Sequence, residues 1–138
     1  MSEIWRIGAD GGGAQQVTAA GGFRAIETGR GLLYVKREAP GLFLKGADGA
    51  ERQLTSALLP VDCGNWTVAG DDVYFIARGD GDAASLRRLS LETGVDADIA
   101  ALDEFPHFSG IAVAPPDWRI YLTKVDLIES DLMMLEGL

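Results

Sequence analysis

Nine polar side chains with the chemistry to bind a ligand lie in short segments between apolar stretches. The nine are Arg37, Asp62, Asn65, Arg78, Asp80, Asp82, His107, Lys124 and Asp126. They combine cations, carboxylates, one amide and one imidazole, a mixture that can recognise a polar ligand or a peptide. Because loops held by a rigid scaffold commonly carry binding groups, we expect a ligand site among these residues. Solvated loops of mixed charge are the alternative interpretation of the same pattern.

Catalytic chemistry has few candidates in this chain. His107 is the only histidine, Cys63 is the only cysteine, and no Gly-x-Ser-x-Gly segment is present. The number of histidines excludes a metal site built from several of them, whereas carboxylates such as Asp62, Asp80 and Asp126 leave a metal site of oxygen ligands open. A pair formed by Cys63 and His107 is the one nucleophilic arrangement to consider. We predict no catalytic residue, no metal and no cofactor.

The balance of charge bears on possible partners. The chain has 12 Lys and Arg residues against 21 Asp and Glu residues, for a net charge of -9. Residues 1–70 are neutral overall, so residues 71–138 carry the whole excess of acid. Proteins bind phosphate groups through Lys and Arg, and we therefore expect neither nucleic acid nor an anionic membrane surface as a partner.

Length and hydropathy favour one domain outside the membrane. A chain of 138 residues is sufficient for one ordinary domain and short for two. The first residues lack the basic start and apolar run of a secretory signal, and no apolar stretch approaches the roughly 18 residues of a membrane helix. The sequence as written predicts a cytoplasmic protein, or a periplasmic one if the chain is a mature fragment.

An internal repeat organises the whole chain. Residues 4–11, followed by Gln16-Val17-Thr18, match residues 42–49, followed by Gln53-Leu54-Thr55. Each copy is an apolar strand, an Ala-Asp-Gly turn and a second strand that ends in Thr. Weaker copies begin at residues 86 and 132, so that the copies are spaced by about 38 to 46 residues.

A second strand rich in aliphatic residues and Tyr lies between these hairpins, at residues 32–35, 73–76 and 120–123. A shorter strand precedes each of its copies, so the full unit has four strands. The apolar residues of the second strand are successive rather than alternating, which indicates that both of its faces are covered. Four-stranded units of this length are the blades of a β-propeller. We predict an all-β fold, a single partial propeller over residues 1–138 with about three blades, and blade-like repeats at residues 4–18, 22–55, 65–100 and 110–138.

Two smaller expectations follow from the same pattern. Residues 56–59 and 102–105 are predicted to form one helical turn each, ended by Pro60 and Pro106. Trp5, Trp66 and Trp118 are predicted to pack in the core between blades.

The chain resembles TolB-type propeller repeats, which are related to WD repeats. The residues that carry the resemblance are Ala114-Pro115-Pro116-Asp117 followed by Ile120-Tyr121, and the intact repeat end at residues 4–18. Residues 129–136 are similar to the closing strand of propellers attached to bacterial winged-helix regulators. The resemblance implies a scaffold, a sensor or the gate of a peptidase, and any DNA-binding role would belong to a winged-helix part that this sequence does not contain.

The expected strands amount to three blades and one spare strand, which cannot close a ring. The chain is therefore expected to be part of a longer propeller, or to form a homodimer in which strands of residues 111–138 pair with residues 15–19 of a second copy. We predict a non-catalytic module for protein or peptide interaction or for ligand sensing. The alternatives are a lactonase-like hydrolase that uses carboxylates and a metal, and a non-catalytic domain of a peptidase.

Overall fold

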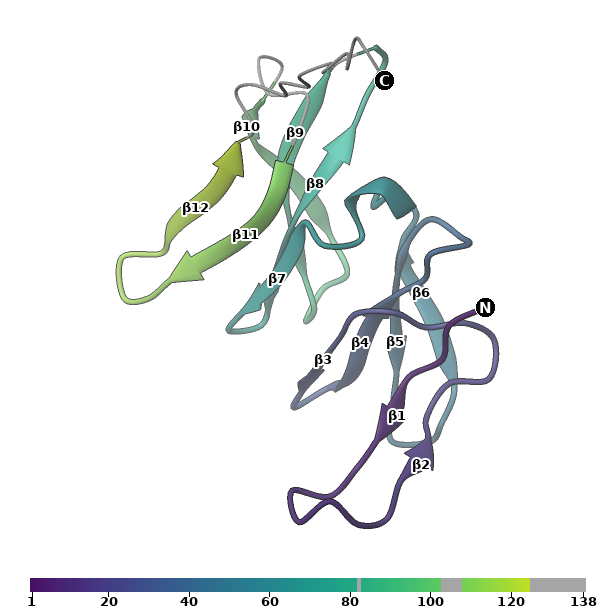
Figure 1. Ribbon diagram of the computed structural model, residues 1–138. Coiled ribbons are helices and arrows are strands. Elements are labelled where there is room, and N and C mark those ends of the chain that lie inside the picture. Colours follow the sequence, from purple (N-terminus) through teal and green to yellow (C-terminus); the bar gives the residue numbers. More distant parts are fainter. Residues whose placement is uncertain (82, 103–107, 125–138) are drawn as a thin grey trace, which may run out of the picture.

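The computed structural model describes residues 1–81, 83–102 and 108–124, and within them the fold is all-β. In these ranges twelve strands form four antiparallel sheets, and within a sheet each strand pairs with the next one along the chain (Figure 1). The first sheet contains β1 (Trp5–Arg6) and β2 (Gln15–Gln16). The second contains β3 (Ala25–Thr28), β4 (Gly31–Val35), β5 (Leu42–Lys45) and β6 (Glu51–Thr55).

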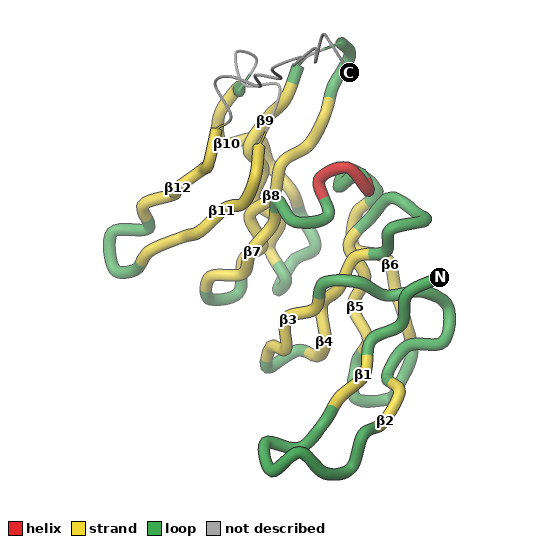
Figure 2. The backbone as a smooth tube through the Cα atoms, in the orientation of Figure 1, coloured by secondary structure: helices red, strands yellow, loops and turns green. Residues whose placement is uncertain are grey.

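The third sheet contains β7 (Trp66–Ala69), β8 (Asp72–Arg78), β9 (Ala84–Ser90) and β10 (Asp96–Ala101), and the fourth contains β11 (Phe108–Ala114) and β12 (Arg119–Lys124). A 3-10 helix, η1 (Pro60–Asp62), lies in the connection from the second sheet to the third and is the red segment of Figure 2. Within the described ranges no helix has the length and apolar character needed to cross a membrane. None of the four sheets closes on itself.

Tight turns allow successive strands to pair directly. In the turn between β3 and β4, Thr28 pairs with Gly31, and the Thr28 hydroxyl donates to the Gly31 carbonyl oxygen at 2.9 Å. Gly31 has a φ of 132°, and a Cβ atom at this position would collide with the backbone carbonyl oxygen of Lys45. Only glycine combines this backbone conformation with so close an approach of the neighbouring strand.

The central strands of the two larger sheets are buried on both faces, as the successive apolar residues predict. In β8 the residues Val73, Phe75 and Ile76 have no exposed surface and Tyr74 retains 7%. Alternation sends Val73 and Phe75 to one face and Tyr74 and Ile76 to the other. Each face of the third sheet therefore needs a partner sheet, which explains why the sheets are stacked.

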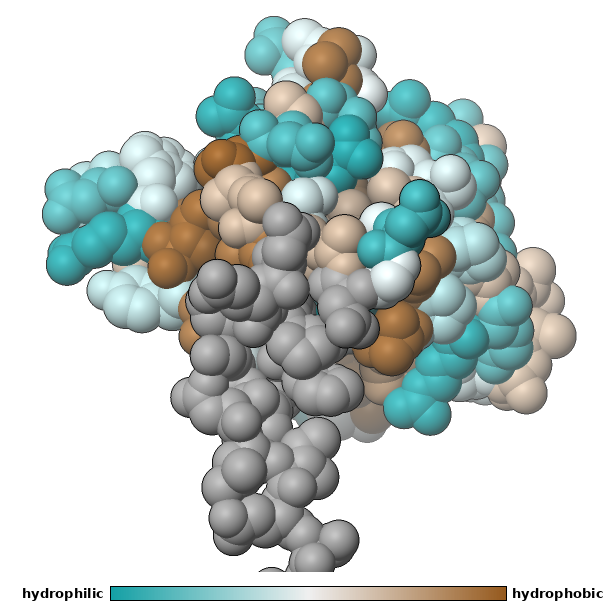
Figure 3. Space-filling view, turned by 90° about the horizontal axis from the view of Figure 1, so that it is seen from above, coloured by the Kyte–Doolittle hydropathy of each residue, from teal (hydrophilic) through white to brown (hydrophobic). Residues whose placement is uncertain are grey.

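Two apolar layers join the sheets in chain order. The first layer lies between the second and third sheets and includes Leu33 and Leu44 on one side and Trp66 and Phe75 on the other. The second layer lies between the third and fourth sheets, where Ile76 and Leu86 meet Ile111. Seen from above, hydrophobic residues gather near the middle of the molecule and hydrophilic residues along much of its edge (Figure 3).

The expected strands of residues 4–18, 22–55 and 65–100 are present, and so are the first two strands of residues 110–138. The last expected strand, near residue 132, lies outside the described residues. The helical turn predicted at residues 56–59 is wrong, because the turn begins at Pro60 instead of ending there. Proline suits the first position of a helix, where its missing N–H has no partner to lose. The turn predicted at residues 102–105 lies largely outside the described residues.

The prediction that all three tryptophans are core residues is correct only for Trp66. Trp66 is fully buried between the second and third sheets, and its indole N–H donates to the Cys63 carbonyl oxygen at 3.0 Å. Trp5 and Trp118 keep 60% and 50% of their surface exposed. Trp5 lies in β1, on the edge with which no described strand pairs, and Trp118 lies in the turn between β11 and β12.

Candidate functional site

Three of the nine predicted site residues meet where the connection after β6 enters the third sheet. Asp62 ends η1, Asn65 precedes β7, and Arg78 ends β8. The backbone N–H of Asn65 donates to the Asp62 carbonyl oxygen at 2.7 Å, which turns the chain tightly enough to point the Asp62 side chain inward. Asp62 is completely buried, and Asn65 keeps only 4% exposure.

Asp62 and Arg78 form a bidentate ion pair. The Arg78 Nε donates to Oδ2 of Asp62 at 2.7 Å, and Nη2 donates to Oδ1 at 2.8 Å. The hydrogen bond to Asp62 raises the pKa of Arg78, against the opposing effect of partial burial. Bidentate geometry gives such a pair direction as well as strength, so it holds the end of β8 against the η1 turn.

Asn65 extends this pair to the fourth sheet. Its Nδ2 donates to Oδ1 of Asp62 at 2.7 Å, and its Oδ1 accepts the backbone N–H of Gly110 at 2.8 Å. The three side chains thus link the connection, the third sheet and β11. Buried polar groups that satisfy one another in this way rigidify a structure. The arrangement of Asp62, Asn65 and Arg78 acts as a structural clamp between sheets.

The remaining predicted site residues are not gathered around this clamp. Arg37 is exposed between β4 and β5, and its guanidinium lies 3.8 Å from the ring centre of Phe23. Asp80 is exposed in the turn after β8. Asp82, His107 and Asp126 lie outside the described residues, and for Lys124 only its place at the end of β12 is described.

Metal-binding groups do not converge within the described part of the chain, where no cluster of three or more His, Cys, Asp or Glu side chains has the geometry to hold an ion. Cys63 carries a free thiol and is half-buried beside the first apolar layer. Both carboxylate oxygens of Asp62 accept hydrogen bonds from Arg78 or Asn65.

A second polar cluster, which the sequence analysis missed, lies on the face of the second sheet that points away from the third. Lys36 Nζ donates to Oε1 of Glu51 at 2.8 Å and lies 4.3 Å from the ring centre of Phe43, and the Tyr34 hydroxyl donates to Oε2 of Glu51. Burial, together with Glu51, raises the pKa of Tyr34 above its usual range. Burial also acts to raise the pKa of Glu51, but the hydrogen bonds from Lys36 and Tyr34 outweigh it and lower that pKa.

Two openings of similar size lie on the same face of the second sheet, beside the first sheet. A crevice of about 410 Å³ is lined by Ile4, Trp5, Arg6, Ile7, Val17, Ala25, Glu27 and Leu32. A second cavity of about 400 Å³ shares four of these residues and adds Arg30 and Lys45. We refer to the first cavity as the β1 crevice. Its walls are mostly apolar, with a few charged groups at the side, as is common for binding clefts.

The backbone of β1 borders the β1 crevice with an open edge. The N–H of Val17 donates to the Ile4 carbonyl oxygen at 2.8 Å, so one hydrogen bond of the antiparallel ladder joins these two residues. The next pair, Trp5 with Gln16, is then of the non-hydrogen-bonded kind, which points the N–H and C=O of Trp5 away from β2. Among the described residues no strand pairs with β1 on that side.

Lys45 fixes the position of the first sheet over the second. Its Nζ donates to the carbonyl oxygen of Val17 at 2.5 Å, and the Thr18 hydroxyl accepts the N–H of Ile4 at 2.9 Å. Across the β1–β2 ladder, Arg6 donates from Nη2 to Oε1 of Gln15 at 2.9 Å. Glu27 is exposed and makes no ion pair with another described residue. The β1 crevice therefore presents an open strand edge, an apolar floor and one free carboxylate.

Comparison with known proteins adds no family to this description: no protein-family model, no curated protein and no solved structure matches the chain.

Proposed function

We propose that the protein is a part of a β-propeller that serves as a protein-interaction module, and that it binds an extended segment of protein along the open edge of β1. The mode of binding is β-strand addition, in which main-chain hydrogen bonds supply affinity and neighbouring side chains supply selectivity. The added segment comes from a second polypeptide or from further residues of the same chain. Binding rather than catalysis is the proposed role, because Asp62, Asn65 and Arg78 engage one another instead of facing a common cavity.

Two features of the fold support the propeller architecture. The second and third sheets each contain four strands in chain order, the third sheet packs on the second, and the fourth packs on the third. The first sheet has only two strands, which match the last two strands of the repeat. A propeller sheet at this place would have two more strands, and the floor of the β1 crevice, formed by Ala25 and Leu32, is the surface that they would cover.

A comparison within the repeat carries the proposal. Trp5 and Phe43 are equivalent residues of two copies, yet Trp5 is 60% exposed and Phe43 only 8% exposed. Ile7, on the same face as Trp5, is 59% exposed. Large apolar side chains that cluster beside an unpaired strand edge mark an interaction surface.

Selection of peptides tests this function. A phage-displayed library of random peptides is selected on the immobilised protein, and the recovered peptides are measured against a Trp5→Ser/Ile7→Ser variant. We expect peptides whose binding is lost in this variant and is kept in Trp118→Ser, a matched control that removes a tryptophan of similar exposure elsewhere. Hydrogen exchange of the bound protein should show protection at Trp5. Peptides that bind the double variant as well as the wild type would overturn the proposal.

A further inference from the structure

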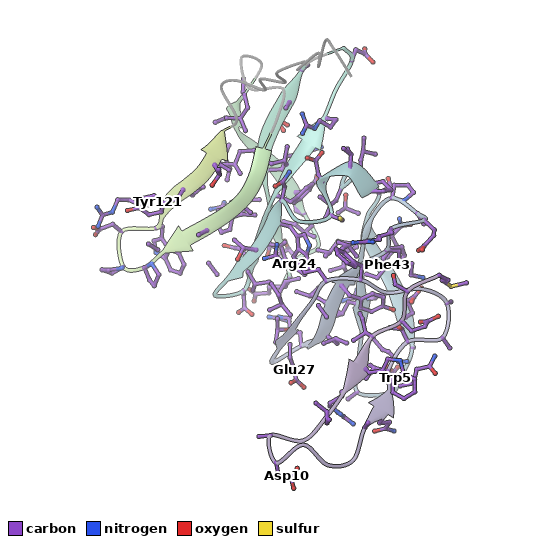
Figure 4. All side chains as sticks on the ribbon, in the orientation of Figure 1. Trp5, Asp10, Arg24, Glu27, Phe43 and Tyr121 are labelled. Carbon is purple, nitrogen blue, oxygen red and sulfur yellow. The ribbon has the colours of Figure 1, made fainter. Side chains whose placement is uncertain are left out.

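The two ends of the row of sheets are complementary in their strands. The first sheet supplies the last two strands of the four-stranded unit, and the fourth sheet supplies the first two among the described residues. Trp5 and Tyr121 lie at these opposite ends of the molecule (Figure 4). A sheet with four strands results when β12 of one chain is placed beside β1 of another, with the β1–β2 hairpin left intact.

At both ends, residues are exposed whose repeat equivalents in the inner sheets are buried. Tyr121 is 54% exposed, whereas its equivalents in the repeat, Leu33 and Tyr74, are 0% and 7% exposed. In the inner sheets these positions face the following sheet. Among the described strands, Tyr121 thus marks a face with no following sheet, just as Trp5 marks a face with no preceding one.

We propose that the β1 crevice is occupied by the β11–β12 hairpin of a second copy of this chain, and that two copies close a ring through two identical contacts of this kind. This inference rests on the proposed function and names the partner of the same site. Tyr121 of the second copy packs on Ala25 and Leu32, and β12 pairs with the open edge of β1. Two-fold closure of this kind leaves no free end on which a further copy could assemble.

Charge complementarity supports this occupant. Arg119 pairs with Ala114 at the end of β12 next to the hairpin turn, on the same face as Tyr121. Glu27 pairs with Leu32 at the corresponding end of β3, and it lines the β1 crevice. The hairpin in the crevice therefore brings Arg119 of the second copy to Glu27. Among the described residues of its own chain, Arg119 forms an ion pair with Asp117 alone, at 3.4 Å, and this largely exposed pair contributes little.

Turns at the same end of the sheets as Arg119 and Glu27 already make contacts between successive sheets within the chain. Arg30 Nε lies 3.2 Å from Oδ1 of Asp71, which connects the β3–β4 turn to the β7–β8 turn. Trp118 in the β11–β12 turn lies against Gly70 in the β7–β8 turn. A contact from the β11–β12 turn of one copy to the β3–β4 region of the next continues this series.

Charge reversal tests the proposal through the molecular mass in solution. Light scattering should give the wild type twice the chain mass of 14.7 kDa, whereas Glu27→Arg alone and Arg119→Glu alone should give the mass of a single chain. An equimolar mixture of the two variants should regain the double mass. In the mixed ring, one contact joins the unchanged Glu27 of one variant to the unchanged Arg119 of the other, and the second contact joins the two substituted residues, whose charges are also opposite. The matched control Glu92→Arg makes the same charge change on an exposed turn outside the crevice and should remain double.

Three results would overturn the inference: a wild type with single mass at every concentration, single variants that keep the double mass, or a mixture that stays single. Restoration in the mixture also shows that both variants are folded. If the wild type is single while selected peptides still require Trp5 and Ile7, the second copy is refuted as partner and the strand-binding function stands. If peptides bind without Trp5 and Ile7, the proposed function itself is refuted.

Discussion

Arg78 donates two hydrogen bonds, of 2.7 and 2.8 Å, to the carboxylate of Asp62, and this ion pair joins the end of β8 to the turn that leads into the third sheet. The carboxylate has no exposed surface, whereas the arginine side chain keeps 18%. Removal of one partner from a buried ion pair leaves the other charge without compensation. The stability of the junction between sheets therefore depends on this pair.

We predict that Asp62→Asn lowers the free energy of unfolding by about 3 kcal/mol. This value is the lower end of the range for a broken buried ion pair, because Arg78 retains contact with water. Urea denaturation monitored by circular dichroism measures the change. Asp71→Asn is the matched control, because its ion pair with Arg30 is 66% and 39% exposed and should change stability by about 0–1 kcal/mol. Equal effects of the two substitutions would contradict the structural role of Asp62.

Gly31 provides a second prediction, about backbone conformation. Its φ of 132° and the nearby carbonyl oxygen of Lys45 leave no room for a side chain. Gly31→Ala should therefore destabilise the protein by about 1–3 kcal/mol or more. Gly29→Ala in the same turn meets no atom within 4 Å, and we expect it to be neutral or to stabilise by about 0.4–1 kcal/mol. Thermal unfolding of the two variants distinguishes these outcomes, and a neutral Gly31→Ala would show that the turn adopts another conformation.

The strands were predictable because their signals are local. Residues 73–76 are apolar at successive positions, and the strand they form is buried on both faces. The repeat also indicated which strands are neighbours, since each unit folds back on itself through short turns. The position of the helical turn is not predictable in this way, because proline both ends a helix and suits its first position, and in η1 Pro60 stands first.

The site was less predictable because its contacts join residues that are far apart in sequence. Asp62 and Arg78 were both candidates for ligand binding, but only the tight turn at Asn65 shows that the carboxylate points inward to the arginine. Lys36 directly follows β4 and Glu51 begins β6, two strands separated by β5, so their ion pair depends on the register of the sheet. The exposure of Trp5 depends on whether another sheet covers its face. Its local sequence, which matches that of the buried Phe43, does not encode this.

The lowered pKa of Glu51 predicts a dependence of stability on acid pH. A carboxyl group whose pKa in the folded state lies below its ordinary value of 4.5 stabilises the fold at higher pH. As the pH falls through this range, the unfolded chain binds the proton first and the contribution is lost. Wild type should therefore lose more stability than Glu51→Gln between neutral pH and the acid range, as measured by urea denaturation at a series of pH values. Parallel losses in the two proteins would show that the hydrogen bonds from Lys36 and Tyr34 do not favour the ionised form.

Arg24 and Arg37 each lie over an aromatic ring, and they allow the same interaction to be compared at a buried and an exposed position. Arg24 is 5.5 Å from the ring centre of the fully buried Trp66 and donates from Nη1 to the Gly64 carbonyl oxygen at 2.6 Å. Arg37 lies over Phe23, which is 37% exposed. A cation next to a ring gains about 0.5–1 kcal/mol at exposed sites and about 2 kcal/mol when water is excluded.

We therefore expect Arg24→Met to lower the free energy of unfolding by about 2–3 kcal/mol, since it removes a charged hydrogen bond as well as the ring contact between the second and third sheets. Arg37→Met should cost less than about 1 kcal/mol. Methionine keeps an unbranched apolar side chain at both positions, so the difference between the two variants isolates the guanidinium group. Denaturant unfolding should also report the environment of Trp66, whose fluorescence should shift to the red in folded Arg24→Met if water enters beside the ring. Equal losses of stability in the two variants would show that Arg24 does not join the two sheets.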